Sequence, residues 1–376
     1  MKVCIVTSSY PQSENDPQAT AGLFVQSFAA ELARQNVEVH VLTYDRGLGA
    51  SAAEPAGVRV SKYAWRGGNR RASYLRPYKP GDVLDILSMI GEGRRSLRRL
   101  HDEQGFEHVF AMWAALGGYL ARDLWRAEGV PYSVWCLGSD IWVYGKYPFF
   151  RRLVRSIIRD AREAYADGYQ LADDAQRLSG RQLEFLASSR KLDLSLRQEL
   201  DIPQDRPNFL CVGRYHRVKG IDVLLEAFAA YRRDGGRGHL FVFGGGPEEE
   251  ALRARAAQVD LVDCVEIGGY ADERTIVSYL AACGTAVIPS RNESIPVVLS
   301  DALQTGTPVI ATDVGDMGRV VRELDAGWVV PAESVDSLCR ALHAASEGPK
   351  TLHQEAVEHF DISRSARRFL KDVTAD

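Results

Sequence analysis

At 376 residues the chain exceeds the size that one hydrophobic core usually supports, so we expect two domains. Its composition, 45% hydrophobic and 26% charged, is that of a folded globular protein and excludes a disordered chain, a fibre and a membrane channel. The net charge of −4, together with basic segments that lack interleaved aromatic residues, argues against nucleic acid as a partner.

The chain starts with a short apolar stretch, residues 3–6, which polar residues follow at once. This stretch is too short for a signal peptide, and no other apolar run approaches the ~18 residues of a membrane-spanning helix. The six cysteines are scattered without a CxxC pair, which favours buried thiols of a reducing compartment over zinc ligands or disulfides. We therefore expect a cytoplasmic protein.

Strands and helices alternate from the start of the chain. A helix begins at Gly22, and its apolar residues Phe24, Phe28 and Leu32 recur every four positions, as one buried face requires. Apolar runs predict strands at residues 3–7, 37–43, 108–112 and 132–136. This order is typical of a doubly wound α/β sheet, in which ligands bind at the carboxyl ends of the strands.

The same pattern begins again in the second half of the chain. A strand at residues 208–212 leads into a loop at 213–220 and a helix at 221–231. Further strands are predicted at residues 239–243, 265–267, 285–288 and 308–311, with helices at 248–259, 273–281 and 296–304 between them. The polar segment 200–206 marks the boundary, so we predict domains at residues 1–200 and 201–358.

Two segments of the first half, residues 91–100 and 149–159, combine arginines and apolar residues at helical spacing. One interpretation is peripheral contact with an anionic membrane surface at the inner face of the cell membrane. The other is that the arginines solvate the outer faces of ordinary domain helices. The sequence leaves both open.

The loop at residues 213–220, Gly-Arg-Tyr-His-Arg-Val-Lys-Gly, lies between a predicted strand and a helix. Backbone amides and the helix dipole favour anions at this position, and Arg214 and Lys219 add two positive charges. This pair suits a diphosphate leaving group, although a basic surface loop would have the same residues.

A second constellation spans residues 289–301. Glu293 lies in its loop, and Pro296 is the predicted first residue of a helix, which leaves the amides near Ile295 and Val297 free for an anion. Asp301 follows about a turn and a half further on. Carboxylates there suit the vicinal hydroxyls of a sugar, whereas taken singly they are ordinary cap or surface residues.

These elements resemble a known family. The Gly-Arg-x4-Lys-Gly loop, the Glu-x7-acidic pair, Gly-Gly-Gly-Pro at 244–247 and Gly-Gly-Tyr at 268–270 are similar in order and spacing to glycosyltransferase family 4, the group 1 glycosyltransferases. The resemblance implies the GT-B fold, an α/β architecture of two Rossmann-like doubly wound domains facing across a cleft. It places the acceptor in the N-terminal domain, the donor in the C-terminal one, and residues 359–376 in a helix that crosses back.

The resemblance also implies roles for single residues. Arg214 and Lys219 would hold the diphosphate, Glu293 the transferred sugar and Asp301 the ribose. Gly22, within the family-like stretch 21–24, would bring a backbone amide to the reacting centre. The remaining donor contacts implied are Gly213, Gly244, Tyr270, Ser294, Ile295, Pro296 and Val297.

Two positions depart from the family pattern. The family usually has glutamate where this chain has Asp301, which shortens the reach to a ribose by about one C–C bond. Leu137 stands where the family often has histidine, while Asp140 remains as a partner for a sugar hydroxyl. Trp113 is a candidate to stack on the acceptor, although buried packing is the stronger expectation for the tryptophans in this region.

No Asp-x-Asp motif and no cluster with metal-ligand spacing is evident, so we expect no cofactor and no metal. The function indicated is a retaining, metal-independent, front-face transfer of sugar from a UDP-, GDP- or ADP-sugar to a hydroxyl of a glycan, glycolipid or small molecule. Two alternatives stay open: a nucleotide-sugar-binding protein without turnover, and a sugar-nucleotide epimerase of the same fold.

Overall fold

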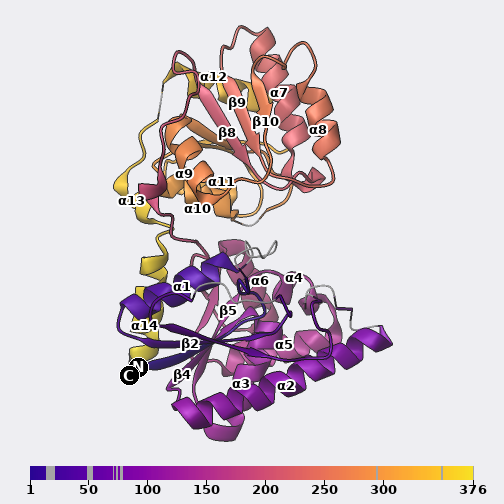
Figure 1. Ribbon diagram of the computed structural model, residues 1–376, viewed down its shortest axis with the longest axis vertical. Helices are drawn as coiled ribbons and strands as arrows, with labels where there is room; N and C mark the ends of the chain where they lie inside the picture. Colours follow the sequence, from indigo (N-terminus) through magenta and orange to yellow (C-terminus); the bar gives the residue numbers. More distant parts are fainter. Residues whose placement is uncertain are drawn as a thin grey trace. The chain divides into compact units, whose positions relative to one another are not determined.

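The computed structural model describes residues 1–13, 22–48, 54–70, 72, 75–76, 79–293, 295–348 and 350–375. The chain forms two compact units (Figure 1). The first unit comprises Met1–Ser188 and Ile362–Asp376, and the second unit comprises Ser189–Asp361.

The first unit is built on a seven-stranded parallel sheet with the order β3-β2-β1-β4-β5-β6-β7. Its strands are β1 (Lys2–Val6), β2 (Glu38–Tyr44), β3 (Val58–Tyr63), β4 (His108–Met112), β5 (Tyr132–Cys136), β6 (Ala164–Ala166) and β7 (Glu184–Phe185). Its helices are α1 (Leu23–Arg34), α2 (Pro80–Gln104), α3 (Gly118–Glu128), α4 (Ser139–Trp142), α5 (Pro148–Asp160), α6 (Tyr169–Ser179) and α14 (Ile362–Thr374). The strand order reverses between β1 and β4, which is where doubly wound sheets bind ligands.

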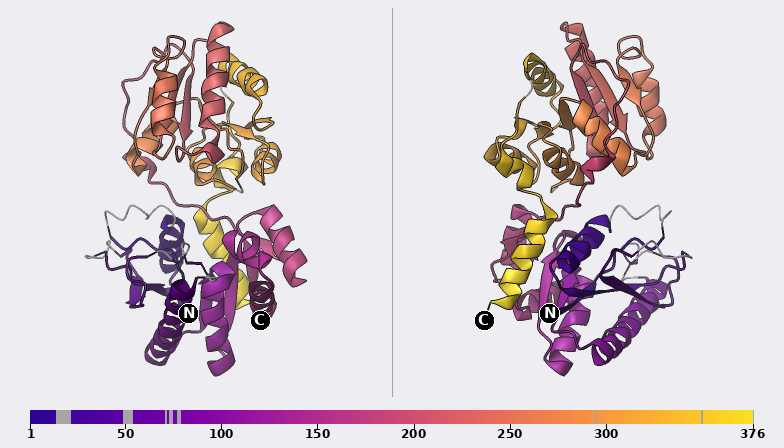
Figure 2. Two further views of the ribbon diagram at one scale, coloured as in Figure 1. Left: turned by 90° about the vertical axis from the view of Figure 1, so that its right-hand side faces the viewer. Right: turned by 60° about the vertical axis from the view of Figure 1, so that its left-hand side comes forward.

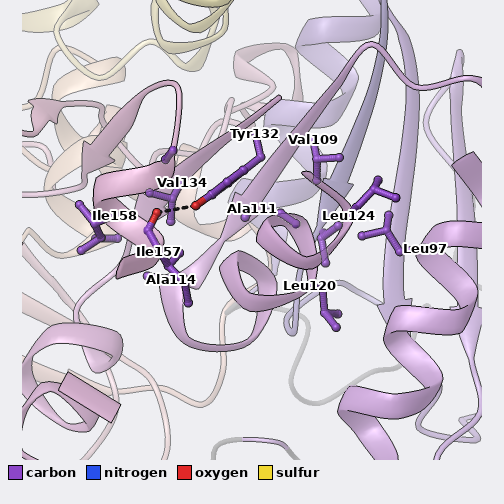
Figure 3. Packing of buried hydrophobic residues seen from close by; sticks show 14 of the residues in the cluster. Leu97, Val109, Ala111, Ala114, Leu120, Leu124, Tyr132, Val134, Ile157 and Ile158 are labelled. Atoms are coloured by element: carbon purple, nitrogen blue, oxygen red, sulfur yellow. Dashed lines mark hydrogen bonds between the residues drawn. The ribbon is translucent and has the colours of Figure 1, made fainter. Parts of the chain in front are cut away.

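Helices cover both faces of this sheet. On one face α2, α3 and α5 pack over residues such as Val109, Val134 and Tyr132, whose hydroxyl donates to the carbonyl of Ile157 at 2.6 Å (Figure 3). On the other face α1 and α14 lie side by side (Figure 2). The Phe369 ring of α14 stacks on Phe110 with centroids 4.3 Å apart.

The second unit contains a six-stranded parallel sheet with the order β10-β9-β8-β11-β12-β13. Its strands are β8 (Asn208–Val212), β9 (His239–Phe243), β10 (Val265–Ile267), β11 (Thr285–Ile288), β12 (Val309–Thr312) and β13 (Gly327–Val330). Its helices are α7 (Ile221–Arg233), α8 (Glu249–Ala256), α9 (Glu273–Ala282), α10 (Val297–Gln304), α11 (Met317–Glu323), α12 (Val335–Glu347) and α13 (Gln354–Glu358). Here the order reverses between β8 and β11. Two doubly wound sheets confirm the predicted fold class.

The limit of the first unit differs from the predicted one, since it falls after Ser188 and not after residue 200. Residues beyond it bond to the second unit: the amide of Asp193 donates to Glu273 at 2.8 Å, and the amide of Gln198 donates to Ser278 at 3.0 Å. The polar segment 200–206 is a loop, as its composition predicts, but it is not the boundary. The bonds from Asp193 and Gln198 show that the chain has already entered the second unit before residue 200. At the other end, the chain rejoins the first unit from residue 362 onward.

All six cysteines are free and buried, which confirms the prediction of buried thiols. Across the described ranges, every helix is either too short or too polar to cross a lipid bilayer.

Candidate functional site

Two loops meet at the carboxyl ends of the neighbouring strands β8 and β11. We call residues 213–220 the first loop and residues 289–296 the second loop. The amide of Arg291 donates to the carbonyl of Val218 at 2.8 Å. Gly220 has φ +64°, and a Cβ there would lie 2.1 Å from the carbonyl oxygen of Pro289, so only glycine fits this close approach. The strand order reverses at this edge, as expected of a ligand site.

Three predicted charged residues sit on these loops. The Lys219 ammonium forms an ion pair with the Glu293 carboxylate, and the two side chains are 20% and 22% exposed. Arg214 is exposed and, within the described parts of the chain, its guanidinium forms no hydrogen bond or ion pair, although its backbone carbonyl accepts from the amide of His216 at 2.8 Å. The structure therefore brings Lys219 and Glu293 together across the two loops and leaves the Arg214 guanidinium available to an anion. Ser294 lies outside the described residues.

Arg291 of the second loop was not singled out from the sequence. Its guanidinium binds both carboxylate oxygens of Asp222 at 2.7 and 2.8 Å, the carbonyl of Arg217 at 2.6 Å and Glu333 at 2.6 Å. The bond from Arg291 lowers the pKa of Asp222, which lies in the first turn of α7. Arg291 thus fastens the second loop to the first loop and to α7. Its partner Arg217 lies more than seventy positions away in the sequence, so no local motif could have identified Arg291.

A third group of predicted residues gathers where β9 and β10 end. A Cβ at Gly244 would lie 1.9 Å from the carbonyl oxygen of Gly213 in the first loop, so these two glycines are in close contact. Tyr215, which sequence reasoning missed, holds the group together because its hydroxyl is 2.7 Å from the carbonyl oxygen of Gly268. Tyr270 is 82% exposed, and its ring lies against Gly245. The result is a surface lined by glycine beside one open aromatic ring, which suits a planar base.

The start of α10 is shifted by one residue from the prediction. Pro296 is buried and precedes the helix as its cap residue with ψ 145°, so the first helical residue is Val297, which is 37% exposed. Ile295 is partly buried in the second loop. The first amides of α10 have no partner within the helix, so the anion site expected there keeps its physical basis.

Asp301 is placed differently from its expected role. Its carboxylate is enclosed and accepts two hydrogen bonds from Arg190, Nε to Oδ1 at 3.0 Å and Nη2 to Oδ2 at 2.5 Å. The side chains are 3% and 11% exposed, and Gln304 Nε2 donates to the Arg190 carbonyl at 2.9 Å. Burial raises the pKa of Asp301, and the Arg190 guanidinium opposes that shift. A carboxylate held in this way presents no open oxygen to a ribose.

Asp140 of the first unit is likewise enclosed, with no measurable exposure. It accepts hydrogen bonds from the amides of Ala114 at 2.9 Å, Leu137 at 3.3 Å and Ile141 at 3.2 Å. Burial raises the pKa of Asp140, while these backbone bonds oppose the shift. The expected contact of Asp140 with a sugar hydroxyl is therefore not what the structure displays: Asp140 ties the segment after β4 to the segment after β5.

Trp113 and Gly22 lie near the reversal point of the first sheet. Trp113 directly follows β4 with φ +64°, a strained value for a residue with a side chain, and its ring meets the edge of Phe24 at 6.1 Å between centroids. Gly22 caps α1, and a Cβ there would lie 2.8 Å from Cα of Tyr10. Its neighbour Ala21 lies outside the described residues. Trp135 is fully buried, as packing predicts.

The two basic segments differ in how their charge is balanced. On α2, Arg94 and Arg98 both pair with Asp123 at 2.8 Å, and Arg95 pairs with Glu92 at 2.8 Å. On α5, four exposed arginines have no ion pair within the described ranges: Arg151, Arg152, Arg155 and Arg159. A hollow of about 310 Å³ lies among the last three of them, Ser156 and Asp160. Tyr147, 48% exposed, and Phe149, 74% exposed, lie at the start of the same helix. Within the described residues Arg99 of α2 also has no ion pair, but of the two segments it is α5 that combines unpaired arginines with exposed aromatic rings.

Comparison with known proteins identifies two matching families. Residues 194–358 match the family described as glycosyl transferases group 1, and residues 20–185 match the glycosyl transferase 4-like domain. Together these matches span most of the chain. The predicted resemblance is thereby confirmed.

Relatives and solved structures agree with this result. A glycosyltransferase of Bacillus subtilis, TuaC, named for teichuronic acid biosynthesis, is 25% identical over 98% of this chain and 96% of its own length. Sucrose-phosphate synthase from Thermosynechococcus elongatus has a similar fold, with a TM-score of 0.74 and 17% identity over 99% of both chains. Anabaena HepE in complex with UDP has a TM-score of 0.71 and 14% identity over the whole of both chains. The chain therefore belongs to the group 1 glycosyltransferases of GT-B fold and is a transferase.

Proposed function

We propose that this chain transfers a sugar from a nucleoside-diphosphate sugar to a hydroxyl acceptor, with retention of anomeric configuration and without a metal ion. The observation that carries the proposal is the meeting of the first and second loops, which pairs Lys219 with Glu293 while Arg214 of the same first loop stays exposed. The donor class is supported by Anabaena HepE, a structural neighbour that has been solved with UDP and with UDP-glucose.

The charges of the two loops suit a leaving diphosphate. Lys219 and Glu293 neutralise each other while no anion is bound, so an incoming diphosphate competes with Glu293 for the Lys219 ammonium. When it does so, the Glu293 carboxylate becomes free to accept hydrogen bonds from the hydroxyls of the sugar. Arg214 adds paired donors for the phosphate oxygens, so protein cations supply the charge that a metal supplies in other transferases.

In the proposed reaction the bond from the anomeric carbon to the diphosphate oxygen breaks, and a bond from that carbon to the acceptor oxygen forms on the same face. The departing phosphate oxygen takes the proton of the acceptor hydroxyl, so no protein base is consumed. Fixed cations stabilise the charge that grows on the phosphate in the transition state. The open Tyr270 ring beside Gly245 would flank the base of the donor.

The test is release of nucleoside diphosphate by single-residue variants in the presence of a chelator. Lys219→Ala and Arg214→Ala should each lower turnover by about 10² to 10³. Arg217→Ala is the matched control, because Arg217 is an exposed arginine of the same loop whose backbone carbonyl, not its guanidinium, contacts Arg291. Turnover of Lys219→Ala at the wild-type rate would contradict the assignment, and so would loss of activity on chelation in protein that circular dichroism shows to be still folded. The anomeric configuration of the product, read by NMR, tests retention.

We also propose peripheral contact of α5 with an anionic membrane surface, supported by its unpaired arginines and by the exposed Phe149 ring. An arginine near such a surface contributes about 1 kcal/mol, so the double variant Arg152→Gln/Arg155→Gln should weaken vesicle binding about 30-fold. The double variant Arg95→Gln/Arg98→Gln on α2 removes the same charge from ion-paired positions and should weaken it far less. Equal loss in both variants, or no binding of wild type to vesicles rich in phosphatidylglycerol, would refute this contact.

A further inference from the structure

Three side chains of metal-ligating type come together in the second unit, at the opposite end of α7 from the first loop. Asp234 lies directly after α7, and Cys339 and His343 lie on α12. One ligand atom of each, a carboxylate oxygen, the thiol sulfur and a ring nitrogen, lie within 4.8 Å of one another. The Cys339 sulfur is 3.8 Å from Oδ2 of Asp234. The cysteine is buried, the histidine partly buried and the aspartate exposed.

The packing of α7 and α12 holds these groups in place. Cys339 and His343 are four residues apart, so they lie on one face of α12. The His343 ring packs on the Tyr231 ring of α7 with centroids 4.7 Å apart, and the Tyr231 hydroxyl bonds to Ser346 at 2.8 Å. Arg340, the nearest cation on α12, bonds to Ser337 and not to Asp234. Both helix surfaces are thus fixed before any ion arrives.

We propose that Asp234, Cys339 and His343 form a binding site for Zn²⁺. A thiolate, an imidazole and a carboxylate are the mixed ligand set that zinc accepts, whereas Mg²⁺ and Ca²⁺ require oxygen ligands alone. In a tetrahedral zinc site with bonds of about 2.0 to 2.3 Å, ligand atoms lie roughly 3.3 to 3.8 Å apart. A contraction of about 1 Å is needed, and the exposed Asp234 side chain can supply it. The thiol proton leaves to solvent as the ion binds, and water takes the fourth position.

The site is structural and not catalytic. It lies beyond the last residue of α7, a helix of 13 residues, and hence roughly 20 Å from the first loop. Bound zinc would join the end of α7 to the middle of α12 and so stabilise the second unit. The inference does not rest on the proposed transfer reaction, since that reaction needs no metal.

The experiment is titration of the metal-free full chain with Co²⁺, which reports thiolate ligation through a sulfur-to-cobalt charge-transfer band. Wild type should develop this band at one equivalent and lose it when Zn²⁺ displaces the cobalt. Zn²⁺ at 100-fold excess over its Kd should raise Tm by about 5 °C or more. His343→Gln, at a partly exposed position, should abolish the charge-transfer band at one equivalent and the zinc-induced shift in Tm.

The matched control is Cys283→Ser, which removes another buried thiol that belongs to no such group of ligands among the residues that the structure describes. It should bind cobalt as wild type does, whereas Cys339→Ser should not. A folded wild type without the band, or a band that survives in His343→Gln and Cys339→Ser, would overturn the proposal. Because the readouts are an absorption band and a melting temperature, failure here is distinct from failure of the transfer reaction.

Discussion

Replacing Asp301 by asparagine separates the two roles that its carboxylate could have. The change keeps the shape of the side chain and one acceptor oxygen, but it removes the one carboxylate that is hydrogen-bonded to the Arg190 guanidinium, 11% exposed, and leaves only the weaker Coulombic attraction of Glu273. Breaking a buried pair by removing one partner costs about 3 to 5 kcal/mol. Since asparagine preserves one of the two hydrogen bonds, we expect a loss of about 2 to 3 kcal/mol for Asp301→Asn and the full range for Asp301→Ala.

Thermal unfolding measures this loss directly. For a unit of this size 1 kcal/mol corresponds to about 2 to 4 °C, so Asp301→Asn should lower the Tm of the second unit by roughly 5 to 10 °C. Replacing both partners, as Arg190→Met/Asp301→Leu, should restore most of the stability because neither charge then remains buried. Nucleotide affinity at a temperature where Asp301→Asn is folded should change by less than about threefold. An unchanged Tm combined with a tenfold loss of UDP affinity would refute this reasoning and would indicate that Asp301 binds the ribose, as the sequence predicted.

Two further predictions concern pH and backbone geometry. Burial lowers the pKa of His108 to about 3 from its ordinary value of 6.5, so the unfolded state binds more protons between these values and stability falls as the pH drops below 6.5. At pH 5, His108 should lower the free energy of unfolding by about 2 kcal/mol. In urea unfolding, the stability of His108→Gln should lack this dependence on pH, and an equal change of stability with pH in both proteins would contradict the prediction. Gly220→Ala should cost on the order of 2 kcal/mol and abolish donor turnover, because a Cβ there meets the second loop at 2.1 Å and strains a φ of +64°. Circular dichroism melts and nucleoside diphosphate release check this against Gly284→Ala, where a Cβ meets nothing within 4 Å, and similar losses in both variants would refute it.

The fold was largely predictable because its core strands are short apolar runs that end at polar loops. Strands β4, β5, β8 and β9 have the predicted bounds, and the repetition of the pattern predicted two sheets. Strand β3 was missed because its sequence, Val-Arg-Val-Ser-Lys-Tyr, is half polar, as the edge position of this strand in the sheet allows. Runs of apolar residues identify the buried strands of the sheet centre and overlook an edge strand that solvent reaches.

The site was predictable as a set of positions and less so as a set of roles. Lys219 and Glu293 do meet, as two loops at adjacent strand ends should. The enclosure of Asp301 depends on Arg190, 111 residues away, and that of Asp140 depends on amides of two separate segments. The spacing of a motif predicts the position of a carboxylate in the chain, but it does not predict which hydrogen-bond or ion-pair partner that carboxylate has in the folded protein. Long-range partners of this kind are fixed only by the packed fold.

The position of α14 has a consequence for how this protein is made. Its Phe369 completes an aromatic cluster with Phe28 and Phe110, residues that belong to the opposite end of the sequence. On the ribosome, this hydrophobic layer stays open until residue 369 has been synthesised, whereas the second unit has all of its strands available earlier. The nascent first unit must therefore wait, with apolar surface uncovered, for α14 to emerge. A stop codon a few positions before residue 369 would leave that surface permanently exposed to aggregation.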